Sequence, residues 1–257
     1  LTLPELAGVI AHELGHFTQG GGMRFGSLAY MSTAWFHDRI HSEDSLDEWV
    51  KANLMDDTHW VVTLCGWLTI MMIGLARLIL RMVNWVGLLL IGFLLRQMEY
   101  HADLHASRLV GVNAFSSTQF ALPPVGMAAD SGTNIALMAI LKAGQAPANL
   151  TAFISYLVDS IPKEVLVEIK RDRQQGKTGP LDTHPSASDR IAAVARDGAK
   201  GIFNLAGPGS ALFRDFPRVC KVASHDLYAS WLGNDLQGAK MIDLSDFRRL
   251  IEDKSET

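Results

Sequence analysis

One stretch of the chain limits its fold more than any other: residues 60–95 contain no Asp, Glu or Lys, and their only charges are two arginines. A single helix over this stretch would be about 54 Å long, whereas the hydrocarbon core of a bilayer is about 30 Å thick. Two spans, about 60–76 and 78–95, fit that thickness better. The sequence therefore predicts a transmembrane helical hairpin whose turn lies near Arg77–Asn84, with the arginines at the headgroups. An apolar hairpin packed inside a soluble domain is the alternative.

Composition sets wider bounds on this chain of 257 residues. Hydrophobic residues make up 48% of it, charged residues 19%, and the formal net charge is −4. There is no basic block with interleaved aromatic residues, so a nucleic-acid partner is not expected. Cys65 and Cys220 lie far apart in the sequence and make no disulfide framework. The length suits one domain with appendages.

A metal-binding motif lies close to the first residue. His12, Glu13 and His16 read H-E-x-x-H, and residues four apart share one face of a helix. The two imidazoles can therefore face one metal ion. Glu13 is one step further round the helix, where it can reach a water bound to that metal. This pattern predicts two zinc ligands and a general base, as in zinc metalloproteases. A helix that carries these residues by chance is the alternative.

Local signals predict that the motif is helical. Thr2 and Glu5 have the spacing of a capping box, and Pro4 is tolerated in a first helical turn. Glycines at 20–22 end the helix. Apolar residues at helical spacing predict one buried face, formed by Leu6, Val9, Ile10, Leu14 and Phe17.

The best candidate for a third ligand follows the apolar stretch. Glu99 and Asp103 are four residues apart, on one face of a predicted helix. Glu99 suits a zinc ligand, and Asp103 suits an acceptor that holds the far nitrogen of a zinc-bound His. A hairpin would return the chain to the side it left, so Glu99 could meet His16. A solvated acidic face is the usual explanation of such a pair. His101 and His105 point away from this face and are interpreted as structural or surface residues.

The rest of the chain is predicted to be helical with breaks. We expect helices over about 24–55, where His37 and His41 are interpreted as exposed, and over 134–142, 148–170 and 187–196. Between 107 and 124 we expect a short helix and a loop, because Pro123-Pro124 breaks regular structure. Residues 201–257 are expected to be small helices capping the domain. His184 lies where a Gly- and Gln-rich loop meets a helix, and spacing alone leaves it either at the metal or in solvent.

Three segments together resemble a known family. "ELAGVIAHELGHF", "EYHADLHAS" and "THPSASDRIAAV" are similar to the catalytic helix, the E-x-x-A-D helix and the late T-H-P segment of the membrane gluzincins. This group holds the CAAX prenyl endopeptidases, the bacterial heat-shock membrane proteases, and periplasmic and mitochondrial relatives. The resemblance covers about residues 1–200.

The resemblance implies roles for individual residues. His12, His16 and Glu99 would bind one zinc ion per chain, and Glu13 would be the general base and acid. Asp103 would support the ligands, and Arg190 would be a structural residue or lie behind the ligands. His184 would either steady the oxyanion or occupy the fourth zinc position.

We therefore expect a mainly α fold: a gluzincin-type metalloprotease domain over 1–200, with the membrane hairpin at 60–95 inserted in it, and a helical extension over 201–257. The expected protein is a multi-pass zinc endopeptidase of a membrane, by resemblance the bacterial inner membrane, acting on a protein or peptide. A latent or non-catalytic zinc scaffold is the alternative, and the oligomeric state is open. The chain begins with Leu1 and enters a helix at once, so we expect it to be part of a longer protein, whose upstream membrane helices and edge strand would complete substrate binding.

Overall fold

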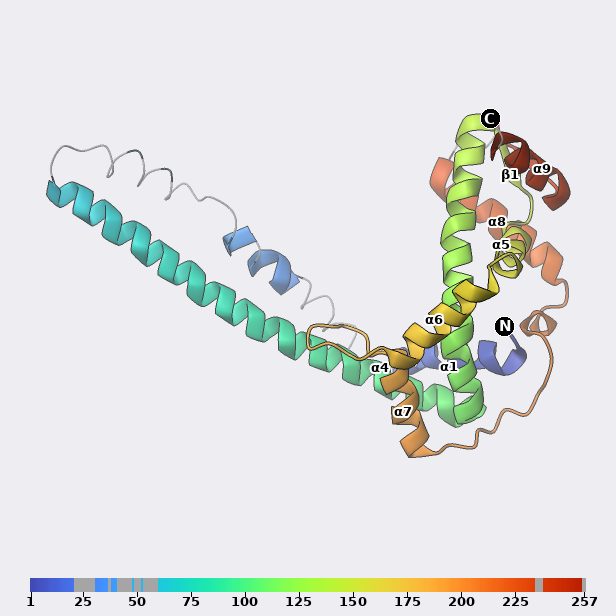
Figure 1. The fold of residues 1–257 in the computed structure, drawn as a ribbon, viewed down its shortest axis with the longest axis horizontal. Helices are drawn as coiled ribbons and strands as arrows, with labels where there is room; N and C mark the ends of the chain where they lie inside the picture. Colours follow the sequence, from blue (N-terminus) through green and yellow to red (C-terminus); the bar gives the residue numbers. More distant parts are fainter. Residues whose placement is uncertain are drawn as a thin grey trace. The chain divides into compact units, whose positions relative to one another are not determined.

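The computed structural model describes residues 1–20, 31–36, 38–40, 48, 52, 60–233 and 238–255. These residues form a mainly helical protein, as the sequence predicts (Figure 1). Their contacts define two compact units: one holds 1–12, 104–177 and 186–257, and the other holds 13–103 and 178–185. Most of the helix predicted over 24–55, with His37 and His41, lies outside the described residues. The predicted domain division at residue 200 stays a prediction.

Helix α1 (Leu3–Thr18) begins at the predicted capping box. The backbone N–H of Thr2 donates to the Glu5 carboxylate at 2.8 Å, and the N–H of Glu5 points back to the Thr2 hydroxyl at 3.5 Å. These contacts satisfy donors that the start of a helix otherwise leaves unpaired. The helix ends shortly before Gly20, whose φ of 39° does not continue a right-handed helix.

The predicted buried face of α1 is wrong for three of its members. Ile10, Leu14 and Phe17 are 44%, 57% and 68% exposed. The buried residues of α1 are instead Leu3, Glu5, Gly8 and Gly15. A Cβ at Gly8 would lie 3.1 Å from the Val110 side chain. The side of α1 that carries the glycines is therefore buried because other parts of the chain approach it closely. The apolar pattern of α1 alone does not reveal which side is buried.

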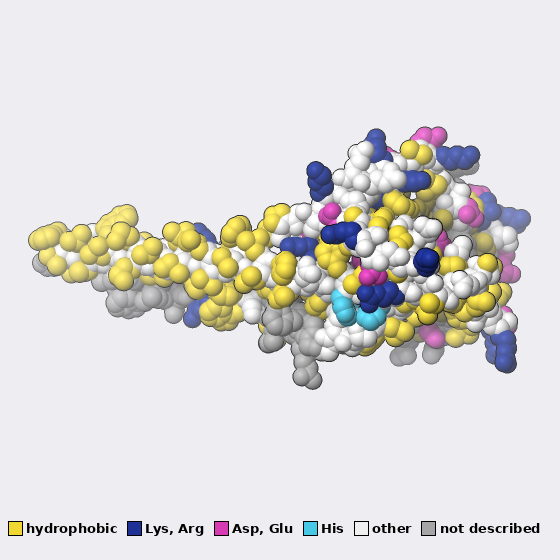
Figure 2. All heavy atoms as spheres, turned by 90° about the horizontal axis from the view of Figure 1, so that it is seen from below, with side chains coloured by type: hydrophobic (Ala, Val, Ile, Leu, Met, Phe, Trp, Pro, Cys, Tyr) yellow, Lys and Arg dark blue, Asp and Glu magenta, His cyan; other side chains and the backbone are white. Residues whose placement is uncertain are grey.

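Helix α4 (Trp60–Ala143) runs unbroken through the apolar stretch, so the predicted hairpin turn near Arg77–Asn84 is wrong. The stretch has no Pro, and none of its glycines adopts a positive φ, so no local signal stops the helix. Of the helices in the described part of the chain, α4 is the one long and apolar enough to cross a membrane. Only 6% of its most apolar 18-residue window is buried, and hydrophobic side chains cover this part of the helix (Figure 2).

The break in α4 lies at Gly111, not at the prolines. Gly111 has φ 83° and ψ 160°, which separates two helical segments. Pro123 and Pro124 lie inside the second segment, so the loop predicted up to residue 124 is wrong. A proline inside a helix removes one backbone donor and usually kinks or breaks the helix. Here the helix nevertheless continues to Ala143.

The core of the larger unit forms around a two-stranded parallel sheet. Strand β1 (Gln145–Pro147) pairs with β2 (Lys240–Ile242), with Gln145 opposite Lys240. No sequence pattern predicted these short strands. Helices α5 (Leu150–Asp159), α8 (Phe216–Leu232) and α9 (Leu244–Ser255) contribute one fully buried aromatic residue each: Phe153, Tyr228 and Phe247.

The remaining elements agree more closely with the sequence. The helix predicted over 148–170 is divided at Pro162, which is the N-cap of α6 (Lys163–Gln175). Helix α7 (Ala187–Asp197) matches the helix predicted over 187–196, and the Ser186 side chain caps it by accepting from the Asp189 N–H at 3.2 Å. A short 3-10 helix, η1 (Gly209–Leu212), precedes α8.

Candidate metal centre

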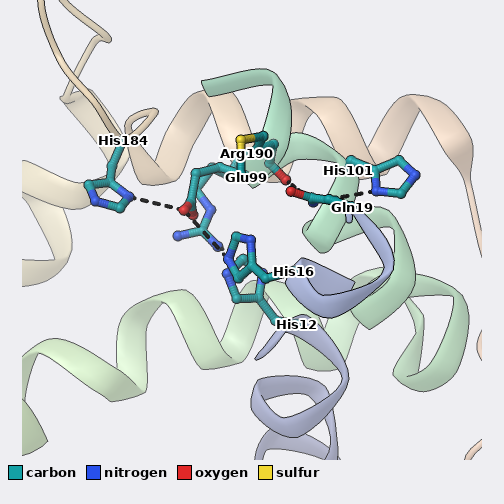
Figure 3. A network of polar contacts seen from close by, with 8 residues as sticks. His12, His16, Gln19, Glu99, His101, His184 and Arg190 are labelled. Carbon is teal, nitrogen blue, oxygen red and sulfur yellow. Dashed lines mark hydrogen bonds and ion pairs between the residues drawn. The ribbon is translucent and has the colours of Figure 1, made fainter. Parts of the chain in front are cut away.

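Three side chains that the sequence singled out come together. One ligand atom each from His12, His16 and Glu99 lies within 4.8 Å of the others. The two histidines are one turn apart on α1, and Glu99 belongs to α4 (Figure 3). In the described part of the chain, this is the one group of three or more His, Cys, Asp or Glu residues so arranged.

The donor set fits zinc. Two imidazole nitrogens and one carboxylate oxygen are ligands that zinc takes in catalytic sites, where a fourth position is left for water or substrate. Nε2 of His16 lies 3.6 Å from Oε1 of Glu99, and the glutamate is buried. A buried carboxylate is costly unless a positive charge or hydrogen bonds offset its desolvation. A divalent cation at this point would supply that charge.

His184 also reaches Glu99. Its Nδ1 lies 3.2 Å from Oε1 of the glutamate, and Figure 3 shows the ring approaching the carboxylate from the loop that leads to α7. The His184 side chain is 72% exposed. The sequence left His184 either at the metal or in solvent, and in the structure its nitrogen touches a predicted ligand while most of the ring stays accessible.

Glu13 and Asp103 occupy contrasting environments. Glu13 is exposed on α1, next in sequence to His12, so its side chain is open to water. Asp103 is completely buried on α4, one turn beyond Glu99. Beside it, a Cβ on Gly15 would lie 3.0 Å from the Cα of Ala102. The glycine within H-E-x-x-H thus allows α1 to lie directly against the part of α4 that carries Asp103.

Arg190 on α7 lies behind one of the histidines. Its Nη2 is 3.5 Å from Nδ1 of His12, and its guanidinium carbon lies 6.0 Å from the centre of the Phe115 ring. A guanidinium has donors only, so a hydrogen bond here requires the lone pair on Nδ1. The proton would then be on Nε2, and metal binding through Nε2 would require this contact to be given up. The contact therefore bears on the tautomer of His12.

Gln19 makes contacts beside the site that the sequence did not predict. Its Nε2 donates to the backbone carbonyl of Met98 at 2.8 Å and lies 3.4 Å from Nδ1 of His101 (Figure 3). It joins the chain just after α1 to the residue before Glu99. A single glutamine three residues after His16 carries no signal that could have revealed this contact. His101, interpreted from the sequence as a structural or surface residue, is exposed.

Comparison with known proteins agrees with the motifs. The family model of Peptidase family M48 matches residues 1–197. Neither the curated proteins nor the solved structures include a significant match to the chain. The matched range contains all of the predicted site residues and agrees with the extent of the resemblance. The family resemblance drawn from the three sequence segments is therefore confirmed.

Proposed function

The chain belongs to Peptidase family M48, a family of zinc metallopeptidases, and we propose that it is a membrane-embedded zinc endopeptidase in which Glu13 is the general base. The observation that carries the proposal is the convergence of His12, His16 and Glu99 within 4.8 Å. These residues would hold one zinc ion. A zinc ion held there would lower the pKa of a bound water towards about 7 and polarise the peptide carbonyl.

The other steps belong to side chains of this chain. The exposed carboxylate of Glu13 takes a proton from the attacking water and passes it to the amine that leaves as the peptide bond breaks. His184 lies beside Glu99 with most of its ring accessible, so with a hydrogen on both ring nitrogens it can donate one hydrogen bond to Glu99 and another to the developing oxyanion. Asp103, buried beside the ligand-bearing turn, holds a ligand side chain in place.

The proposed location is a membrane, by resemblance the bacterial inner membrane. Its support is the exposed apolar surface of α4, including Trp60, Trp67 and Trp85, which are more than half exposed. Apolar residues exposed over so long a helix are costly in water and favourable in lipid. Tryptophans near the ends of a span prefer the interface. The substrate would be a protein or peptide, and a multi-pass arrangement would need membrane helices besides α4.

The experiment compares wild type with Glu13→Gln and Glu99→Ala, purified in detergent, for zinc content and casein cleavage. We expect one zinc and activity in wild type, one zinc without activity in Glu13→Gln, and loss of zinc in Glu99→Ala. Glu164→Gln, at an exposed position in the first turn of α6, is the control and should match wild type. Casein cleavage by Glu13→Gln at the wild-type rate would refute the mechanism.

The contact of His184 with Glu99 favours one alternative, a latent enzyme or non-catalytic zinc scaffold. A fourth protein ligand would leave no position for water. In that case wild type would bind zinc but cleave nothing, and His184→Ala would open the site. Activity that appears only in His184→Ala would identify a latent enzyme, and zinc without activity in both proteins would identify a scaffold.

A further inference from the structure

The loop that carries His184 is fastened to α4 by a residue outside the predicted site. Nη1 of Arg96 donates to the backbone carbonyl of Asp182 at 2.6 Å and to that of Pro180 at 3.2 Å. Both carbonyls lie in the segment 178–185, which we call the strap. Figure 1 shows the strap running along α4 before α7 begins. One guanidinium therefore holds the strap backbone at two points.

Gly92 provides the space for this contact. It is buried, and a Cβ there would lie 3.0 Å from Nη1 of Arg96, 3.4 Å from the Asp182 carbonyl oxygen and 3.5 Å from that of Pro180. A Cβ would crowd the guanidinium, whereas it would lie at ordinary contact distance from the two carbonyls. The missing side chain at Gly92 and the guanidinium of Arg96 together form a seat for the strap.

The seat is in register with the candidate metal centre. Gly92, Arg96 and Glu99 are spaced by four and three residues, so they lie on one face of α4. The strap contacts this face at 182 and again at His184, whose Nδ1 is 3.2 Å from Glu99. Within the strap, the Gly179 N–H donates to the Asp182 carboxylate at 2.6 Å, which stiffens the turn that faces Arg96.

The position of His184 depends on its backbone. With its side chain 72% exposed, packing does little to fix the ring, so the placement of the strap decides where the imidazole lies. We propose that Arg96 is a positioning residue that acts through His184: it seats the strap on α4 and thereby holds the imidazole at Glu99. The effect on catalysis rests on the proposed function, whereas the seating of the strap does not.

Hydrogen exchange on metal-free protein tests the seat directly. In Arg96→Ala, amides of 178–184 should exchange about tenfold faster, because two hydrogen bonds from a charged donor are lost. Arg96→Lys keeps a charged donor but lacks the planar guanidinium. Its exchange rates should therefore fall between those of wild type and Arg96→Ala. Gly92→Ala leaves Arg96 in place and crowds the seat, so it should also speed exchange. Arg108→Ala is the control, because Arg108 is on the same helix and pairs with Asp197.

A double-mutant cycle tests the action through His184. Arg96→Ala should keep its zinc and lower kcat about tenfold. In a His184→Ala background the same change should have little further effect, because the residue through which it acts is gone. Unchanged exchange in both Arg96→Ala and Gly92→Ala would overturn the proposal, as would fully additive effects of Arg96→Ala and His184→Ala on kcat. An inactive wild type would instead refute the proposed function, and the exchange arm would still decide whether Arg96 seats the strap.

Discussion

The break in α4 offers a sharp test of how backbone geometry supports this fold. Gly111 has φ 83° and ψ 160°, a region that only glycine adopts readily. In Gly111→Ala, the new Cβ would lie 2.6 Å from the carbonyl oxygen of Lys200 and 3.1 Å from its carbonyl carbon. Neighbouring backbone bonds hold that segment in place: the N–H groups of Ile202 and Phe203 both donate to the Leu109 carbonyl.

Two costs add in this variant. The unfavourable backbone conformation costs about 1–3 kcal/mol, and the clash with held backbone adds an overpacking cost of about 1–3 kcal/mol. We expect the free energy of unfolding to fall by about 3–4 kcal/mol. For a chain of this size, that lowers Tm by roughly 6–16 °C.

The matched control is on the same helix. Gly126 is helical, and a Cβ there would meet nothing within 4 Å. Gly126→Ala should therefore stabilise the protein by up to about 1 kcal/mol, because alanine favours a helix over glycine. The assay is thermal unfolding in detergent, monitored by far-ultraviolet circular dichroism. A Gly111→Ala protein as stable as Gly126→Ala would refute the reasoning.

Two further predictions concern buried polar groups. Burial raises the pKa of Glu5, but hydrogen bonds from Ser117 and Thr2 outweigh burial, and the pKa of Glu5 is lowered from its ordinary 4.5. The ionised carboxylate therefore stabilises the fold above pH 4.5, and this contribution is lost as the pH falls through the lowered pKa. At neutral pH, Glu5→Gln should lower the free energy of unfolding by about 1 kcal/mol. The difference in Tm between this variant and wild type should shrink in acid, and a difference that grows in acid would contradict a lowered pKa of Glu5. Burial also raises the pKa of Tyr228, so its hydroxyl stays protonated and donates to the Pro147 carbonyl at 3.1 Å. Tyr228→Phe should cost about 1–2 kcal/mol in urea unfolding, and unchanged stability would show that the bond contributes nothing.

Local signals predicted the start of α1 and the extent of α7, and they singled out the three side chains that come together as a candidate metal centre. The Thr2–Glu5 capping box and the Ser186 cap depend on residues within one turn, so the sequence contains the whole cause. The spacing of His12 and His16 fixes their common face in the same way. Glu99 could be chosen because it follows both H-E-x-x-H and the apolar stretch and lies four residues before Asp103.

Two kinds of feature could not be predicted. The first is the course of the apolar stretch: the turn near Arg77–Asn84 was inferred from bilayer thickness, yet no residue there stops a helix. The second kind is set by backbone that is distant in the sequence. The break at Gly111 depends on the chain at Lys200, whereas the prolines that suggested a break lie within a helix. Gln19 and Arg96 act on backbone carbonyls about 80 residues away, and a carbonyl leaves no trace in the sequence.

The unbroken course of α4 from Trp60 to Glu99 has a consequence for how this chain can vary. The apolar stretch and Glu99 share one helix, so each inserted residue rotates the downstream part of the helix by about 100° relative to the upstream part. An insertion before Gly92 would lengthen the apolar segment and leave Gly92, Arg96 and Glu99 in phase with one another. An insertion between Arg96 and Glu99 would swing the carboxylate out of phase with the seat of the strap, and so away from His184. Natural variants of this chain should therefore differ freely in length before residue 92 and keep the spacing from 92 to 103 constant.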